Sequence, residues 1–313
     1  MEVPNYHIPV MLEPSVDGLN VRKSGVYVDV TLGGGGHSRE ILFRLSEKGR
    51  LFSFDQDADA IRRCEQQIPS FELSDAPHGQ WTLVYSNFRY LKNWMRYYGV
   101  EAIDGLLADL GVSSHHFDEG QRGFSFKSDA PLDMRMNQQA RQTAADVVNT
   151  YSREQLTAIF RLYGELQQGH RLAEALVKAR SRQEIHTTGQ LAEVLTPLLG
   201  RDRTQKDMAR AFQALRIEVN HEMDALRDML SAATELLAPG GRLVVLSYHS
   251  LEDRIVKNVM RAGNAEGELE QDIYGNSHSP LRPMGKPMAP SAEEQAANPR
   301  SRSAKLRIAE KQA

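Results

Sequence analysis

The sequence predicts an α/β fold, in which a parallel sheet with helices on both faces is interrupted by an all-helical insertion. Over residues 26–110, short β-branched or apolar runs alternate with amphipathic segments, a pattern typical of βαβ units. The alternation then stops, and residues 143–199 are rich in Ala, Leu, Glu, Gln and Arg without a convincing strand. A further apolar run at 242–247 resumes the α/β pattern. We therefore expect one α/β domain whose sequence is split by a helical segment.

The first part of the chain supplies four predicted strands. They cover residues 26–31, 50–55, 82–85 and 103–110. After the first strand, Ile41, Leu42 and Leu45 fall on one face of a predicted helix that ends at Gly49. A second helix is expected around residues 58–67. Helices thus connect successive strands, as a parallel sheet requires.

The rest of the chain is predicted to form a long ordered loop, the helical segment and a return to the sheet. The loop covers residues 117–137. Apolar residues on one helical stripe, from Met208 to Val219, predict a helix that continues to Leu237. Residues 238–241 (APGG) predict a turn into the strand at 242–247, and residues 263–299 lack periodicity and are expected to be a loop. The predicted organisation is a first α/β part at 1–116, the insertion at 117–205 and a second α/β part at 206–313.

The composition is that of a globular protein with a sizeable core. Of 313 residues, 41% are hydrophobic and 25% are charged, which excludes disorder and a disulfide-stapled mini-domain. The net charge is −3, from 38 Lys+Arg against 41 Asp+Glu, so any nucleic-acid function must rest on a local patch. Cys64 is the single cysteine, and no apolar run approaches the roughly 18 residues of a membrane span. Since the N-terminal sequence also lacks a signal-peptide pattern, we expect a cytosolic protein without membrane contact.

A nucleoside-binding site is predicted after the first strand. Four consecutive glycines, 33–36, let backbone N–H groups approach a ligand, and Asp55 at the end of the second strand can accept hydrogen bonds from ribose hydroxyls. Asp55 follows Gly33 by 22 positions, close to the roughly 20 expected for such an acid. The glycines alone would also fit a plain strand–helix turn, but Asp55 and the βαβ context favour the binding site.

The loop favours S-adenosylmethionine over the other nucleoside cofactors. The dinucleotide fingerprint is absent, because Ser38 or Arg39 stands where its third glycine belongs. No Gly-Lys-Ser/Thr follows, which excludes a P-loop. The spacing from Asp29 to the glycines instead fits a methyltransferase better than an oxidoreductase.

The sequence also resembles a known family, the bacterial 16S ribosomal RNA cytosine-N4 methyltransferases, or small-subunit methyltransferase H. The resemblance extends through most of the chain. Its motifs, in chain order, are GGGGHS at 33–38, DLGVSS at 109–114, RGFSF at 122–126, PLDMRMN at 131–137, FQALRIEVN at 212–220, HSLEDR at 249–254 and NPRSRS at 298–303. So many blocks in the family's order exclude a chance match.

The resemblance implies a class I, Rossmann-like methyltransferase fold and a set of S-adenosylmethionine contacts. The contacts expected in the glycine loop are Gly33, Gly35, Gly36 and His37. The other implied contacts are Asp55 on the ribose, Phe88 beside the adenine, Asp109 and His116. The family usually has Gln at the position of His116, although an imidazole can also donate or accept a hydrogen bond. A second departure, at residues 163–168, makes contacts from the insertion harder to transfer.

Asp109 is the candidate catalytic residue. The exocyclic amine of cytosine is a poor nucleophile, because its lone pair is delocalised into the ring, and an acceptor for its N–H protons would orient and activate it. Asp109 ends the fourth strand, where ligand crevices of parallel sheets lie. A role in cofactor binding alone, or in capping the next turn, is equally compatible. Cys64 is expected in a helix away from the crevice, in a structural role. This argues against C5 methylation through a thiolate.

The substrate surface is expected to be basic. Residues 201–216 carry a net charge of +3 and residues 298–313 one of +4, although such runs are often plain solvated faces. The insertion is expected to recognise 16S rRNA in the small ribosomal subunit. The candidate RNA contacts are Arg122, Arg135, Arg216, Arg254, Arg300 and Arg302. Phe117, Phe124 and Phe126 could stack on an extruded base or pack in the insertion.

No metal site is expected, and His249 is predicted to be satisfied by the carboxylates near it. A homodimer is possible. The alternatives to the cytosine-N4 enzyme are a methyltransferase on another RNA base and a non-catalytic assembly factor that binds S-adenosylmethionine or RNA. The methylated nucleoside distinguishes these functions.

Overall fold

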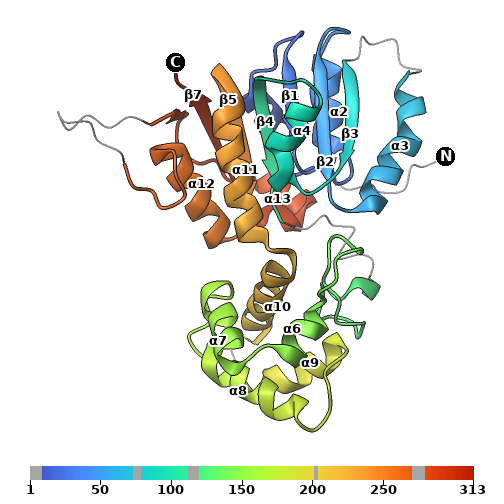
Figure 1. Ribbon diagram of the computed structural model, residues 1–313, viewed down its shortest axis with the longest axis vertical. Helices are drawn as coiled ribbons and strands as arrows, with labels where there is room; N and C mark the ends of the chain where they lie inside the picture. Colours follow the sequence, from blue (N-terminus) through green and yellow to red (C-terminus); the bar gives the residue numbers. More distant parts are fainter. Residues whose placement is uncertain (1–8, 73–78, 112–119, 201–203, 270–278) are drawn as a thin grey trace. The chain divides into compact units, whose positions relative to one another are not determined.

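The computed structural model describes residues 9–72, 79–111, 120–200, 204–269 and 279–313 (Figure 1). The chain divides into two compact units. The first comprises Met1–Gly111 and Asp224–Ala313, and the second comprises Val112–Met223. The second unit therefore extends 18 residues beyond position 205, where the sequence placed its end, because α10 (Thr204–Asn220) packs against the other helices of this unit.

The first unit is built on a seven-stranded sheet with the order β3-β2-β1-β4-β5-β7-β6. The strands are β1 Val26–Asp29, β2 Arg50–Asp55, β3 Gln80–Tyr85, β4 Ile103–Asp109, β5 Leu237–Ser247, β6 Leu281–Pro283 and β7 Lys305–Lys311. Strands β1 to β5 pair in parallel, whereas β7 runs antiparallel to both β5 and β6. The prediction of a wholly parallel sheet is thus wrong for β7, which runs antiparallel to both of its neighbours.

Helices cover both faces of this sheet. They are α1 Leu12–Leu19, α2 Gly36–Arg44, α3 Ala58–Glu72, α4 Leu91–Tyr97, α11 Glu222–Leu236, α12 Ser250–Ala262 and α13 Ala292–Ala297. Tyr27, Leu51 and Val244 are fully buried in one cluster with residues of α1 and α2. The alternate residue Phe52 points to the opposite face, where its ring lies 5.1 Å from that of Tyr98, which follows α4. Figure 1 shows α4 and α11 on the same face of the sheet.

Strand β5 begins earlier than predicted. Residues 238–241 belong to the strand instead of forming a turn before it. They coincide with a register shift, since Ile103 pairs with Leu237 but Gly105 pairs with Arg242. Gly240 takes a left-handed φ of 77°, which a glycine adopts without strain. The Pro-Gly-Gly signal therefore marks an irregularity inside the strand.

One predicted helix is two. The helix expected from Met208 to Leu237 is broken into α10 and α11 at His221, whose φ of 49° is left-handed and cannot continue a right-handed helix. Asn220 holds the break in place. Its side chain accepts a hydrogen bond from the Met136 N–H (2.7 Å) and donates one to the Met134 carbonyl (2.8 Å).

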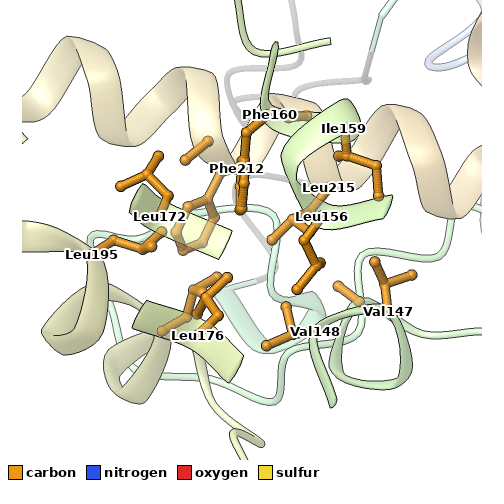
Figure 2. Packing of buried hydrophobic residues seen from close by; sticks show 14 of the residues in the cluster. Val147, Val148, Leu156, Ile159, Phe160, Leu172, Leu176, Leu195, Phe212 and Leu215 are labelled. Carbon is orange, nitrogen blue, oxygen red and sulfur yellow. The ribbon is translucent and has the colours of Figure 1, made fainter. Parts of the chain in front are cut away.

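The second unit is a helical bundle with its own core. Before α10 it contains α6 Ala144–Thr150, α7 Arg153–Leu162, α8 Gly169–Arg180 and α9 Thr188–Leu195. Thr143, Ser152 and Thr187 begin three of these helices with reciprocal capping boxes. Figure 2 shows the apolar side chains of the core meeting between the helices. Among them are Phe160, Leu172, Leu195 and Phe212. The all-helical insertion predicted from composition is therefore a packed unit.

The segment expected to be an unstructured loop at 263–299 contains regular elements where the structure describes it. Strand β6 and helix α13 both lie within it. Among the described residues, no helix combines the length and the apolar character needed to cross a bilayer.

Two leucines of α7 provide a matched test of the helical core. Leu156 is fully buried, whereas Leu162, six residues later, is 63% exposed. Leu156→Ala should lower the free energy of unfolding by about 2–5 kcal/mol, because it removes buried methyl groups and leaves a cavity. Leu162→Ala should change it by less than about 0.5 kcal/mol. Urea unfolding followed by circular dichroism measures both, and equal effects would contradict the packing described here.

Candidate active site

The glycine loop joins β1 to α2 at the carboxyl end of the sheet. Gly33 and Gly35 have left-handed φ angles of 50° and 77°, and Gly35 precedes the first residue of α2. The Leu32 N–H donates to the Phe54 carbonyl (2.8 Å), which fixes the loop against β2. A helix N-terminus with a glycine cap leaves backbone N–H groups free of bulky side chains, as a nucleoside ligand requires.

Cys64 lies beneath this loop, so the expectation that it sits away from the crevice is wrong. A Cβ added at Gly35 would lie 3.0 Å from the Cys64 sulfur, and Cys64 is buried together with Leu32 and Ile61. Burial raises the pKa of the Cys64 thiol to about 11, so the group is protonated at neutral pH. A protonated, buried thiol is a poor nucleophile. Position 35 favours glycine because its φ of 77° is left-handed, and the Cys64 sulfur adds a close neighbour to any Cβ there.

Asp55 is oriented by the backbone on either side of it. Its Oδ2 accepts a hydrogen bond from the Gly33 N–H (2.9 Å), and its Oδ1 accepts one from the Asp57 N–H (2.8 Å). Each carboxylate oxygen has a second lone pair for another donor. The side chain is partly exposed at the end of β2, beside the glycine loop. This arrangement can accept the two hydroxyl protons of a ribose.

Phe88 directly follows Asn87, whose side chain bonds to Gln56 and so connects the segments after β3 and β2. It begins a short 3-10 helix, Phe88–Tyr90, just after β3. The preceding residue, Asn87, accepts from the Arg89 N–H (2.9 Å) and donates from its amide to Gln56 (2.8 Å), the residue after Asp55. Half-buried Phe88 thus directly follows a residue that is bonded to the neighbour of Asp55. His116 lies outside the described residues.

A directed chain of hydrogen bonds connects side chains of three neighbouring strands and of α2. The Trp81 indole N–H of β3 donates to Ser53 Oγ of β2 (2.8 Å), and the Ser53 hydroxyl lies 2.8 Å from that of Ser38 on α2. Ser38 in turn donates to Asp29 Oδ2 of β1 (2.6 Å). Since Asp29 is fully buried, these bonds replace the water that its carboxylate would otherwise need.

The same carboxylate is connected to the fourth strand. Thr31 donates to Asp29 Oδ1 from both its N–H (3.0 Å) and its hydroxyl (3.3 Å). The Thr31 oxygen accepts from the Asp109 N–H (2.7 Å), which fixes the end of β4 relative to the glycine loop.

Asp109 and His37 face one another at this point. The Asp109 side chain is 20% exposed, and its Oδ2 lies 3.9 Å from His37 Nδ1. The other ring nitrogen, Nε2, is 3.1 Å from the Val10 carbonyl. A carbonyl only accepts, so Nε2 carries a proton, and in the uncharged ring Nδ1 is then the acceptor. The two groups can therefore receive N–H donors of a ligand.

Tyr248 was not anticipated from the sequence. Its hydroxyl donates to Asp109 Oδ1 (2.6 Å), although 139 positions separate the two residues. Tyr248 directly follows β5, and β5 pairs in parallel with β4. The rule that ligand crevices lie at the carboxyl ends of parallel strands could have pointed to it.

Three of the predicted RNA-contacting arginines have structural partners within the second unit. Arg122 donates to the Arg135 and Met136 carbonyls (2.8 and 2.9 Å). Arg135 pairs with Asp133 (2.7 Å), and Arg216 makes two hydrogen bonds with Glu222 (2.7 and 2.8 Å). Burial would raise the pKa of Asp133, but hydrogen bonds from Arg135 outweigh it and lower that pKa. These arginines therefore stabilise loops and helix ends of their own unit.

The predicted basic tail is largely part of the sheet. Lys305 and Arg307 of β7 both pair with Asp253 (3.1 and 2.6 Å), and Lys311 donates to the Thr234 carbonyl (2.7 Å). Arg254 and Arg302 are exposed. Arg300 lies in the 3-10 helix Pro299–Ser303.

Two of the phenylalanines considered for base stacking belong to the helical core. Phe124 is 6% exposed, and the Phe126 ring packs against Phe212 at 5.5 Å. The packing alternative is thus correct for both, whereas Phe117 lies outside the described residues. His249 caps the N-terminus of α12: its Nδ1 accepts from the Glu252 N–H (3.4 Å), and its Nε2 lies 3.0 Å from Glu252 Oε1.

Two carboxylates, a histidine and the glycine loop come together at the carboxyl ends of β1, β2 and β4. The loop has no third glycine for a pyrophosphate, the Asp55 carboxylate is bonded to the Gly33 and Asp57 N–H groups, and Asp109 lies near His37. The fold and site thereby define the class of S-adenosylmethionine-dependent methyltransferases with a Rossmann-like sheet. The seven-stranded sheet with helices on both faces confirms the fold class expected from the sequence, and the family match described next supports the expected cofactor.

The chain belongs to the MraW methylase family, whose model matches residues 5–312. It is 58% identical over 307 residues to a ribosomal RNA small subunit methyltransferase H from Bacteroides thetaiotaomicron, which covers 98% of this chain and 97% of that protein. Proteins of the same name from Cytophaga hutchinsonii and Christiangramia forsetii are 50% and 48% identical. The Cytophaga match covers 98% of this chain and 100% of that protein. The Christiangramia match covers 99% of each. The family resemblance expected from the sequence motifs is confirmed.

The proposed ribose contact at Asp55 can be tested by cofactor binding. Asp55→Ala should weaken S-adenosylmethionine binding at least about 30-fold, since loss of one hydrogen bond to a charged group costs about 2 kcal/mol. Asp17→Ala, at an acid whose side chain is 67% exposed, is the control and should leave the Kd unchanged. Calorimetry on both folded variants measures the effect. An unchanged Kd in Asp55→Ala would remove Asp55 from the site.

Proposed function

We propose that this protein transfers a methyl group from S-adenosylmethionine to the exocyclic N4 of a cytidine in 16S rRNA of the small ribosomal subunit. The observation that carries this proposal is the Asp109 carboxylate, held at the end of β4 beside the glycine loop with one oxygen directed toward His37. The relatives named for small-subunit ribosomal RNA support the substrate. We further propose that the protein acts in the cytoplasm and that the helical insertion contributes to substrate recognition.

The chain's residues divide the work between binding and proton transfer. S-adenosylmethionine, when bound, supplies an electrophilic methyl group on a sulfonium. Asp55 and the glycine loop would hold its nucleoside, with Phe88 beside the base. Positioning supplies most of the acceleration in such a transfer, because both reactants are held in one site.

Asp109 is proposed to act on the amine. A carboxylate that accepts an amine N–H keeps the nitrogen lone pair directed away from that bond and toward the electrophile. Methylation makes the nitrogen cationic, and one proton must then leave. Asp109 can take that proton and release it to solvent, since its side chain is partly exposed. No thiolate is required, in agreement with the protonated state of Cys64.

The methylated product tests the function. The protein is incubated with labelled S-adenosylmethionine and with either naked 16S rRNA or small subunits, and the RNA is then digested to nucleosides for mass spectrometry. N4-methylcytidine is the expected product. A different methylated nucleoside would replace the proposed substrate atom, and cofactor binding without incorporation would indicate an assembly factor.

Asp109→Asn separates catalysis from cofactor binding. Asparagine keeps an oxygen that can accept from Tyr248, but it cannot take a proton from the amine. We expect kcat to fall by about 100-fold to 10,000-fold while the Kd for S-adenosylmethionine changes by only a few fold. Single-turnover rates and calorimetry measure the two quantities. A loss of rate no larger than the loss of affinity would make Asp109 a cofactor residue only.

Arg254 and Arg302 are proposed RNA contacts, since both are exposed in the first unit. Replacing both with alanine should weaken RNA binding and lower the slope of log Kd against log salt by about two, one for each lost phosphate contact. Arg227→Ala is the control, because Arg227 is partly exposed and pairs with Asp224 of its own helix. Fluorescence anisotropy at several salt concentrations measures the slope. A double variant with the wild-type slope would exclude both residues.

Four other predicted RNA contacts stay predictions: Arg122, Arg135, Arg216 and Arg300. For the first three, contact with RNA would have to use guanidinium donors beyond those bound within the unit. A homodimer is also proposed from the sequence, and light scattering of the purified protein tests it.

A further inference from the structure

Tyr248 makes a contact with the proposed proton acceptor that family motifs around Asp109 do not suggest. The phenol hydroxyl donates to Asp109 Oδ1 at 2.6 Å, while Oδ2 of the same carboxylate is turned toward His37. A hydrogen bond to a charged acceptor is short and strong compared with a neutral one. Tyr248 therefore restricts the rotation of the Asp109 carboxylate.

The position of Tyr248 is itself fixed by its surroundings. Its backbone N–H donates to Glu252 Oε2 (2.9 Å), and Glu252 is 2% exposed in the first turn of α12. The N–H of His249 donates to the same oxygen (3.3 Å). The ring lies against the backbone of Gly111, where an added Cβ would be 3.6 Å from Tyr248 Cδ2, and it packs on the apolar cluster under α1 and α2. The hydroxyl thus has little freedom to leave Asp109.

The charges around this pair come from several elements. His37 faces Asp109 from α2, and Asp29 lies behind it through Thr31. Glu252 of α12 and Glu294 of α13 act on Tyr248. Burial, followed by the negative charge of Asp109, raises the pKa of Tyr248 well above its usual value, so the phenol is a neutral donor.

We propose that Tyr248 is a positioning residue for Asp109: by holding Oδ1 it fixes the orientation of the whole carboxylate, whose Oδ2 faces His37, for its role toward the substrate amine. This inference rests on the proposed role of Asp109. Two roles follow for the hydrogen bond. It fixes the direction of Oδ2, and it stabilises the ionised carboxylate, which must be unprotonated to accept a proton.

Stabilisation of the ionised carboxylate should also change how the reaction rate depends on pH. A donor to the carboxylate lowers the pKa of Asp109 relative to the same site without that donor. Activity that needs ionised Asp109 is lost as the pH falls through this pKa. Without the phenol hydroxyl the pKa rises, so the loss must occur at a higher pH.

Tyr248→Phe tests this proposal, with Tyr27→Phe as the matched control. Tyr27 is also a buried tyrosine of the first unit, but its hydroxyl accepts from the Arg22 N–H (2.7 Å), outside the proposed machinery. For Tyr248→Phe we expect kcat to fall about 10-fold to 100-fold and the acid limb of the kcat–pH profile to move up by about one to two pH units. The Kd for S-adenosylmethionine should change by less than about threefold. For Tyr27→Phe the acid limb should not move, whatever the change in melting temperature.

The outcomes distinguish the two proposals. If Tyr248→Phe lowers the melting temperature as Tyr27→Phe does but keeps the wild-type kcat and acid limb, Tyr248 has only a structural role. If Asp109→Asn retains full activity, the proposed role of Asp109 fails independently of Tyr248. An inactive Asp109→Asn variant together with an unaltered Tyr248→Phe variant would overturn the positioning role alone.

Discussion

The buried carboxylate of Asp29 is the interaction on which the site depends. A fully buried anion is costly unless its oxygens receive hydrogen bonds, and here Ser38 donates to one oxygen while Thr31 donates to the other. Ser38 belongs to α2 and Thr31 to the loop before it, so satisfying one charge fixes the path of the glycine loop. The Asp109 N–H, which donates to Thr31, adds the end of β4 to the same network. The glycine loop and the proposed catalytic carboxylate are thereby connected through one set of hydrogen bonds.

Several basic side chains that the sequence offered for RNA binding are neutralised by acidic partners in the structure. Many of the cations that looked available for a polyanion are paired inside their own unit, as Arg216 is with Glu222 and Arg307 with Asp253. Ion pairs of this kind are more buried than ordinary surface pairs, and removal of one partner would leave an uncompensated charge. Sequence runs of Lys and Arg therefore overstated the basic surface. The proposed RNA contacts at Arg254 and Arg302 are those whose side chains lie exposed.

Local signals were accurate where a short stretch of chain determines its own structure. The strand predicted at 50–55 is β2, and Asp55 ends it as expected. Errors arose where distant segments compete with local preference. The helical pattern from Met208 to Leu237 is continuous in sequence, yet His221 breaks it while Asn220 bonds to the segment at Met134–Met136. The Pro-Gly-Gly run at 239–241 has strong turn chemistry, but pairing with β4 keeps it in the strand.

By itself the sequence determined the α/β class, the helical insertion, the nucleoside loop and the family, because hydrophobic periodicity, glycine spacing and motif order are properties of contiguous residues. Only the tertiary structure decided the direction of β7, the place of Cys64 beneath Gly35 and the contact of Tyr248 with Asp109. Each of these joins segments far apart in the chain. Sheet order and strand register bring them together, and neither is encoded in any single stretch of sequence.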